Sequence, residues 1–136
     1  MWSKLKQFIR SKLTPANDSN RDLWVIGKLS SLAAGAKLLD AGSGTQPYRK
    51  FTDHLQYYSQ DFSKYDGVGD GTGRQKNFPY GNMDYVCNIW EIPEQDSFFD
   101  AILCTEVLEH VPYPNETLLE FARLIKDNGT LLLTCL

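Results

Sequence analysis

The sequence lacks any long apolar run. No stretch of its 136 residues approaches the roughly 18 consecutive apolar residues that a membrane-spanning helix needs, so no transmembrane segment is predicted. No continuous apolar core follows the positive residues near the start, which argues against a signal peptide. A disulfide framework is also missing, because the three cysteines are odd in number and each lies in an apolar run. We therefore expect buried thiols and a cytoplasmic location.

Basic residues are scarce on the body of the chain. Residues 1–13 hold four cations and no acid, so against a net charge of −3 for the whole chain the remainder carries −7. Residues 84–127 alone hold ten acids, against only Arg123 and Lys126. A nucleic-acid-binding domain needs a basic patch, so we expect no nucleic-acid partner.

The first 14 residues form a segment of their own. Apolar residues recur at helical spacing between the cations, which predicts a short basic amphipathic helix over 1–14. Two roles stay open for it. Residues 1–13 could lie on a membrane surface, or the helix could pack on the domain and cover its site.

Residues 15–136 alternate between strand and helix patterns. This alternation predicts an α/β fold in which a parallel sheet is built through right-handed crossovers. Asn115 is expected to be the N-cap of the last helix, Asn128-Gly129 its C-terminal stop, and Leu118 and Leu119 part of its buried face. Strands are expected at 36–41, 55–59, 84–89, 101–104 and 130–136. One helix is expected to end near residue 34, and further helices are expected at 48–54, 105–111 and 115–127. Residues 63–82 are expected to form a long loop, which contains five glycines.

The stretch at residues 36–48 carries the strongest functional signal. A short apolar run ends in Asp40 and passes directly into the turn Gly42-Ser43-Gly44. Glycines permit a positive φ and let a ligand approach the backbone closely. Ligands of open α/β sheets bind outside the carboxyl ends of the strands. The sequence therefore predicts a nucleoside pocket over this turn.

Several motifs follow the turn in a recognisable order. Asp61 ends the second expected strand and Asn88 the third, and the later pieces are Phe99-Asp100-Ala101 and Thr105-Glu106-Val107-Leu108-Glu109-His110-Val111. In this order they resemble the class I S-adenosylmethionine-dependent methyltransferases, and in particular the small-molecule branch with an Asp-x-Gly-x-Gly loop. The resemblance covers about residues 36–136.

The resemblance implies a Rossmann-like sheet with strand order 3-2-1-4-5 and flanking helices. Complete members have seven strands, so it also implies a partial domain over 15–136 that lacks the last two. The rival is a nicotinamide-dinucleotide fold, whose fingerprint is Gly-x-Gly-x-x-Gly. Pro47 occupies the position of the third glycine, which argues against that rival.

The implied cofactor is S-adenosylmethionine. In the family the glycine turn underlies the methionine part, and the acid at Asp40 helps hold the amino group. The acid at Asp61 takes the ribose diol, for which its two acceptor oxygens are suited. The residue at Asn88 faces the adenine amine. The implied cofactor-binding residues are Asp40, Gly42, Gly44, Asp61, Phe62, Asn88, Ile89 and Thr105.

The segment from Thr105 to Val111 supplies the candidate catalytic groups. His110 or Glu106 is the nearest candidate for a base. On a helix, Glu106, Glu109 and His110 would share a face and could bind a divalent cation, as similar segments do in some related O-methyltransferases. In other relatives the same segment only shapes the pocket. Both alternatives stay open, although we expect no metal.

The expected function is methyl transfer to an unidentified small-molecule acceptor. The alternative is a non-catalytic cofactor-binding or interaction module that pairs through the exposed fifth strand with a partner chain or another copy, because an uncovered apolar edge strand is a docking surface.

Overall fold

The computed structural model of the protein describes residues 16–62 and 83–135. The predictions for the N-terminal helix over 1–14 and for the glycine-rich loop over 63–82 lie outside these residues. None of the described helices is long and apolar enough to cross a membrane.

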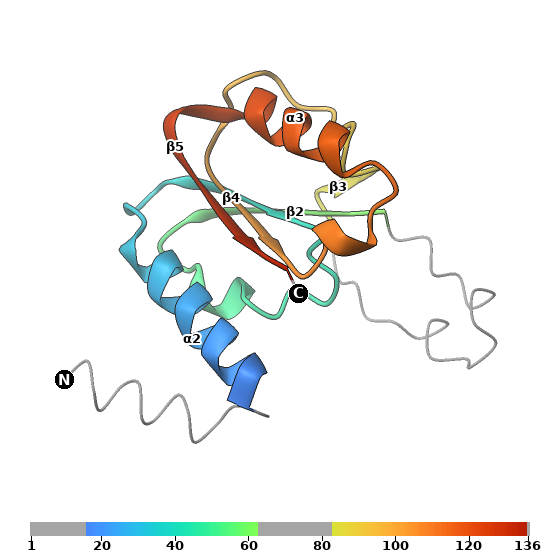
Figure 1. Cartoon of the computed structure of the whole chain (residues 1–136). Coiled ribbons are helices and arrows are strands. Elements are labelled where there is room, and N and C mark those ends of the chain that lie inside the picture. The colour runs from blue at the N-terminus through green and yellow to red at the C-terminus, as the bar shows by residue number, and fades with distance from the viewer. Residues whose placement is uncertain (1–15, 63–82, 136) are drawn as a thin grey trace.

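The described residues form one five-stranded sheet, in which every pair of neighbouring strands is parallel (Figure 1). The strand order is β3-β2-β1-β4-β5, so the predicted order is confirmed. The central strand β1 therefore has β2 on one side and β4 on the other. The strands are β1 (Lys37–Ala41), β2 (Gln56–Asp61), β3 (Tyr85–Val86), β4 (Phe99–Thr105) and β5 (Ile125–Thr134).

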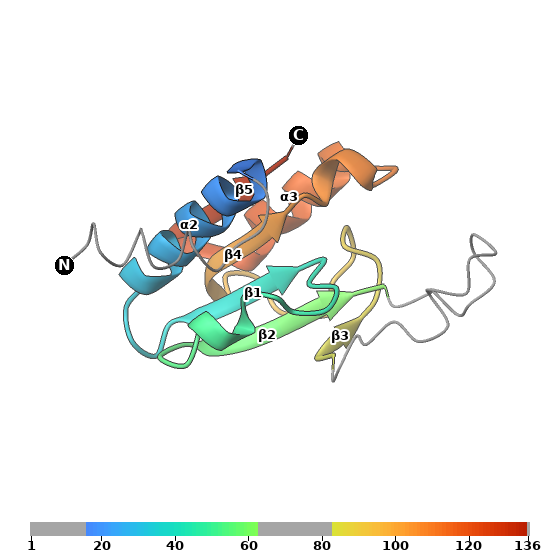
Figure 2. The same cartoon turned by 90° about the horizontal axis from the view of Figure 1, so that it is seen from below.

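Two helices cover the opposite faces of the sheet (Figures 1 and 2). They are α2 (Ala16–Ser31) and α3 (Pro114–Leu124). Successive side chains of a strand point to opposite faces. Accordingly Leu38 packs in a cluster with Val25 of α2, whereas its neighbour Leu39 packs in a separate cluster with Phe121 of α3. Burial on both faces explains the adjacent apolar residues Leu38-Leu39 in β1 and the apolar run 101–104 in β4.

The N-terminal part of α3 differs from the prediction. The helix begins at Pro114 with Tyr113 in the N-cap position, so the prediction that Asn115 is the N-cap was wrong. Proline suits the first helical position because its fixed φ matches the helix and the N–H that it lacks would have no helical partner there.

The buried face of α3 also differs. It consists of Thr117, Phe121 and Leu124, whereas the exposed fraction of Leu119 is 71%. The predicted face was thus rotated, because it left out Phe121, the largest apolar side chain of the helix. The helix ends at Leu124, and Asn128 has a left-handed φ of 64° inside β5 instead of forming a helix stop.

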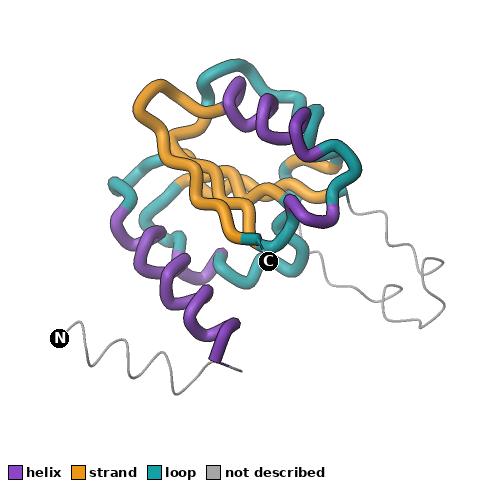
Figure 3. The backbone as a smooth tube through the Cα atoms, viewed as in Figure 1, coloured by secondary structure: helices purple, strands orange, loops and turns teal. Residues whose placement is uncertain are grey.

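Other predicted elements are present with different bounds (Figure 3). Helix α2 ends at Ser31, before the expected end near 34; it buries Val25 and Leu29, whereas Trp24 is 42% exposed. Strand β3 has only two residues. The predicted helices at 48–54 and 105–111 are each reduced to one 3₁₀ turn, over Arg49–Phe51 and Leu108–His110.

Arg123 of α3 fixes the segment that joins β3 to β4. Its guanidinium donates hydrogen bonds to the carbonyl oxygens of Glu94 (2.7 Å) and Ile92 (2.9 Å), and it pairs with Asp96 (2.8 Å) and Glu120 (2.6 Å). The Glu120 carboxylate in turn accepts a hydrogen bond from the Ile92 backbone N–H at 2.6 Å.

Replacing Arg123 by methionine is expected to lower the free energy of unfolding by about 2 kcal/mol, because two carbonyl groups lose their donor and the largely buried Glu120 keeps only the Ile92 N–H. Chemical denaturation measures the loss. The matched control is Lys126→Met, which removes one ion pair to Asp100 at 3.2 Å on a side chain that is 41% exposed, and it should cost less than about 1 kcal/mol. Equal losses in the two variants would contradict this assignment.

Candidate functional site

A cavity of about 340 Å³ lies at the carboxyl ends of β1, β2 and β4. This volume lies within the range of small-molecule sites, which runs from about 300 to 1,000 Å³. Polar and apolar side chains contribute to its walls. The lining residues are Gly42, Gly44, Gln60, Asp61, Phe62, Asn88, Ile89, Trp90, Glu106, Val107, His110, Val111 and Pro112.

The glycine turn that follows β1 is tied to the end of β2 through its backbone amides. The N–H of Gly42 donates to the side-chain oxygen Oε1 of Gln60 at 2.9 Å. The N–H of Ser43 donates to the Gln60 carbonyl oxygen at 2.9 Å. The N–H of Gly44 donates to Asp61 Oδ2 at 2.9 Å. Three successive amides are thus satisfied inside the protein.

These hydrogen bonds favour a nucleoside site over a dinucleotide site. A dinucleotide-binding turn points backbone N–H groups at the pyrophosphate of its ligand. Here the amides of Gly42, Ser43 and Gly44 already have partners. The turn therefore offers its glycines as close-approach positions and not as an anion site.

Asp40 lies beneath the turn and does not line the cavity. Its exposed fraction is 1%, and it accepts a hydrogen bond from the hydroxyl of Tyr57 at 2.5 Å. Burial raises the pKa of Asp40 from 3.8 to about 7; the Tyr57 hydrogen bond opposes this rise and the charge of Asp61 adds to it. Thr105 also lies outside the lining. The predicted contacts of Asp40 and Thr105 with a cofactor stay predictions.

The other predicted cofactor-binding residues are brought together around the cavity. Gly42, Gly44 and Asp61 lie at its β1 and β2 side, and Phe62, Asn88 and Ile89 also line it. Five lining residues were not among the predicted site residues: Gln60, Trp90, Val107, Val111 and Pro112. Gln60 was treated as the end of a strand, although it directly precedes Asp61. Trp90 was treated as loop, although a large aromatic residue directly after Asn88-Ile89 was a usable signal.

The segment after β4 does not form the predicted helix. Glu106 has a left-handed φ of 53°, and the 3₁₀ turn begins only at Leu108. The shared helical face of Glu106, Glu109 and His110, on which a metal site was considered, was therefore a wrong prediction. Within 16–62 and 83–135, no three His, Cys, Asp or Glu side chains are grouped as metal ligands.

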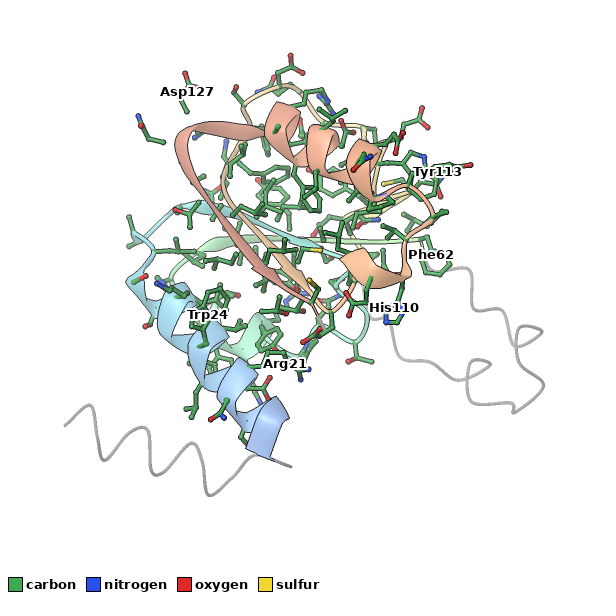
Figure 4. All side chains as sticks on the ribbon, viewed as in Figure 1. Arg21, Trp24, Phe62, His110, Tyr113 and Asp127 are labelled. Atoms are coloured by element: carbon green, nitrogen blue, oxygen red, sulfur yellow. The ribbon has the colours of Figure 1, made fainter. Side chains whose placement is uncertain are left out.

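Both candidate catalytic residues nevertheless line the cavity. His110 is at the rim with a side chain that is 76% exposed, and its Nε2 is 3.8 Å from Glu109 Oε1. Phe62, which also lines the cavity, lies at the same end of the sheet as His110 (Figure 4).

A cation from α2 approaches the cavity as well. Nη1 of Arg21 lies 3.6 Å from Oε1 of Glu106, whereas Oε2 of Glu106 is buried and has no hydrogen-bond partner in the described part of the chain. The role of Arg21 is not visible in the sequence, because nothing in its local pattern shows that α2 approaches the end of β4.

The open parallel sheet, with its cavity over a glycine turn and an acid at the end of the second strand, defines a nucleoside-cofactor domain of the α/β class. A family profile described as "Methyltransferase domain" matches residues 2–136. The chain belongs to this family, the class I S-adenosylmethionine-dependent methyltransferases.

One curated relative and two solved structures illustrate what the chain is similar to. The chain is similar to a ubiquinone biosynthesis O-methyltransferase of Xanthomonas oryzae pv. oryzae, with 49% identity over 43 residues, which are 32% of this chain and 18% of that protein. The [4+2]-cyclase SpnF matches 79% of this chain and 41% of its own with a TM-score of 0.57 and 23% identity. Phosphoethanolamine N-methyltransferase 2 of Haemonchus contortus, in complex with S-adenosyl-L-methionine, matches 79% of this chain and 26% of its own with a TM-score of 0.55 and 20% identity.

The two structural similarities show the fold alone. The chain spans 18% of the length of the O-methyltransferase that it matches.

Proposed function

We propose that this chain binds S-adenosylmethionine and forms the cofactor-binding part of an enzyme that methylates a small molecule. The observation that carries the proposal is the turn itself: its glycines border the cavity while its amides are held by Gln60 and Asp61. A cofactor without phosphate groups is compatible with such a turn, whereas a dinucleotide is not.

The residues around the cavity fit the parts of this cofactor. Asp61 is suited to the ribose hydroxyls, because a carboxylate accepts two hydrogen bonds. Asn88 and Ile89 offer a polar edge and an apolar surface for adenine on the β3 side. Gly42 and Gly44 leave room for the methionine chain.

The charges near Glu106 fit the methionine part of the cofactor, which carries an ammonium and a carboxylate group. Glu106 has one oxygen near Arg21 and one buried oxygen without a partner. A buried acceptor without a donor is costly, so a ligand ammonium group there would be favourable. The guanidinium of Arg21 matches a carboxylate in charge and in hydrogen-bond geometry.

Bound in this cavity, the cofactor would supply an activated methyl group on sulfur. The protein then has to align the acceptor with that group, and alignment alone can remove several kcal/mol from a barrier. We propose an oxygen acceptor, in line with the O-methyltransferase similarity, and His110 as the residue at the rim that takes its proton.

Calorimetry with S-adenosylhomocysteine, the demethylated product, tests the proposal. The wild type is expected to bind it, and Asp61→Asn should weaken binding by about 10- to 100-fold, because a hydrogen bond to a charged group contributes about 1.5–3 kcal/mol. Asp53→Asn is the control, since Asp53 is exposed and does not line the cavity. Absence of binding heat for folded wild-type protein would refute the cofactor assignment.

The second candidate function is a non-catalytic module that pairs through β5. It is favoured by the position of β5 at the edge of the described sheet, where Leu131 is 41% exposed. Light scattering over a range of concentrations tests for self-association of the chain. A concentration-independent monomer that binds the cofactor would count against pairing with a second copy.

A further inference from the structure

Gln60 joins the two sides of the cavity through its side-chain amide. Its Oε1 accepts the hydrogen bond from the Gly42 N–H at 2.9 Å, and its Nε2 donates to the carbonyl oxygen of Cys87 at 2.8 Å. Gly42 belongs to the turn after β1, and Cys87 directly precedes Asn88 after β3. The exposed fraction of Gln60 is 1%, so water does not replace these bonds.

The position of β2 explains why one side chain reaches both sides. Strand β2 lies between β1 and β3 in the sheet, so a residue near its carboxyl end has both neighbours within reach. The two partners also fix the orientation of the amide: the Gly42 N–H can only donate and the Cys87 carbonyl can only accept. Glutamate and methionine have similar lengths, but neither an ionised glutamate nor a methionine can donate to Cys87.

From this geometry we infer that Gln60 is a positioning residue that sets the separation between the glycine turn and Asn88. The inference rests on the proposed function, in which one ligand reaches both sides: its methionine part the turn and its adenine part Asn88. A ligand that spans the cavity needs the two sides at a fixed distance. A ligand that reaches only one side does not.

The test compares S-adenosylhomocysteine, which reaches both sides, with adenosine, which reaches only the Asn88 side. In Gln60→Met the affinity for S-adenosylhomocysteine is expected to fall at least about tenfold, because both hydrogen bonds are lost, whereas the affinity for adenosine should change less than about threefold. S-adenosylhomocysteine is used in place of S-adenosylmethionine because it carries no sulfonium charge that a carboxylate introduced at residue 60 could attract.

Gln60→Glu adds a pH profile that general destabilisation would not produce. A protonated carboxyl group has one acceptor and one donor, like the amide, and burial raises the pKa of such a group toward neutrality. The affinity of this variant for S-adenosylhomocysteine, relative to wild type at the same pH, should recover as the pH falls from about 8 to about 5.5. Gln60→Met should show no recovery. The matched control is Gln56→Glu, at the exposed start of the same strand, where the side chain donates to Gly35.

The outcomes separate the inference from the proposed function. A wild type that does not bind S-adenosylhomocysteine refutes the proposed function. A wild type that binds, together with a Gln60→Met variant of equal affinity or with equal losses for both ligands, overturns the positioning role. Should neither Gln60 variant fold, NMR of the wild type decides: the Gly42 N–H, bonded to Gln60, is expected to exchange with solvent as slowly in the ligand-free protein as with S-adenosylhomocysteine bound, and fast exchange in the ligand-free protein overturns the inference.

Discussion

Replacing Asp40 by asparagine is expected to remove a pH dependence of stability that amounts to about 2.5 kcal/mol between about pH 5 and pH 8. In the folded protein burial raises the pKa of Asp40 from 3.8 to about 7. The folded state therefore holds a proton that the unfolded chain releases. Wild-type stability should fall as the pH rises from about 4 through 7, because burial disfavours the ionised form of Asp40.

Urea denaturation of wild type and Asp40→Asn at several pH values measures this difference. The slope of the wild-type stability between about pH 5 and pH 8 should largely disappear in the variant. Asp53→Asn should leave the slope unchanged, because Asp53 is exposed. A variant with the wild-type slope would mean that Asp40 is already ionised throughout this range.

Gly42→Ala is expected to lower the free energy of unfolding by about 3 kcal/mol through two separate effects. The φ of Gly42 is +69°, a conformation that alanine adopts only with strain. A Cβ atom at this position would also lie 2.6 Å from Cγ2 and 2.9 Å from Cγ1 of Val107, so the segment after β4 would have to move.

Gly35→Ala separates the two effects. Gly35 has a similar φ of +82°, but a Cβ atom there meets nothing within 4 Å. Its substitution should therefore cost only the backbone strain, about 1 kcal/mol. Thermal unfolding of both variants gives the comparison. Similar losses would show that Val107 adapts without cost, and that the turn does not need glycine for its close approach.

The sheet could be predicted from the sequence because its determinants are local. The apolar run before Asp40 and the short segment that ends in Asp61 predict strands, and the resemblance to the family supplies their order. The cavity residues Gly42, Gly44, Asp61 and Asn88 follow from the same rule, since they lie at the carboxyl ends of strands.

Features that depend on contacts between distant segments could not be predicted in this way. The buried face of α3 is set by the packing of Phe121 in the cluster that contains Leu39 of β1, and its first residue is Pro114. The left-handed Glu106 donates its N–H to the carbonyl oxygen of Thr134 of β5, 28 residues later, a contact that no local pattern reveals. Neither Arg21 nor Gln60 has a sequence pattern that identifies its partners.

The hydrogen-bonded backbone amides of the glycine turn also affect the kinetics of ligand binding. Glycine-rich turns are usually among the most flexible parts of a domain, but the amides of Gly42, Ser43 and Gly44 are all bonded to β2 before any ligand arrives. Little conformational entropy remains to be lost there on binding. Association should therefore proceed in a single step without a slow ordering phase, and these three amides should exchange with solvent as slowly as those of the neighbouring strands.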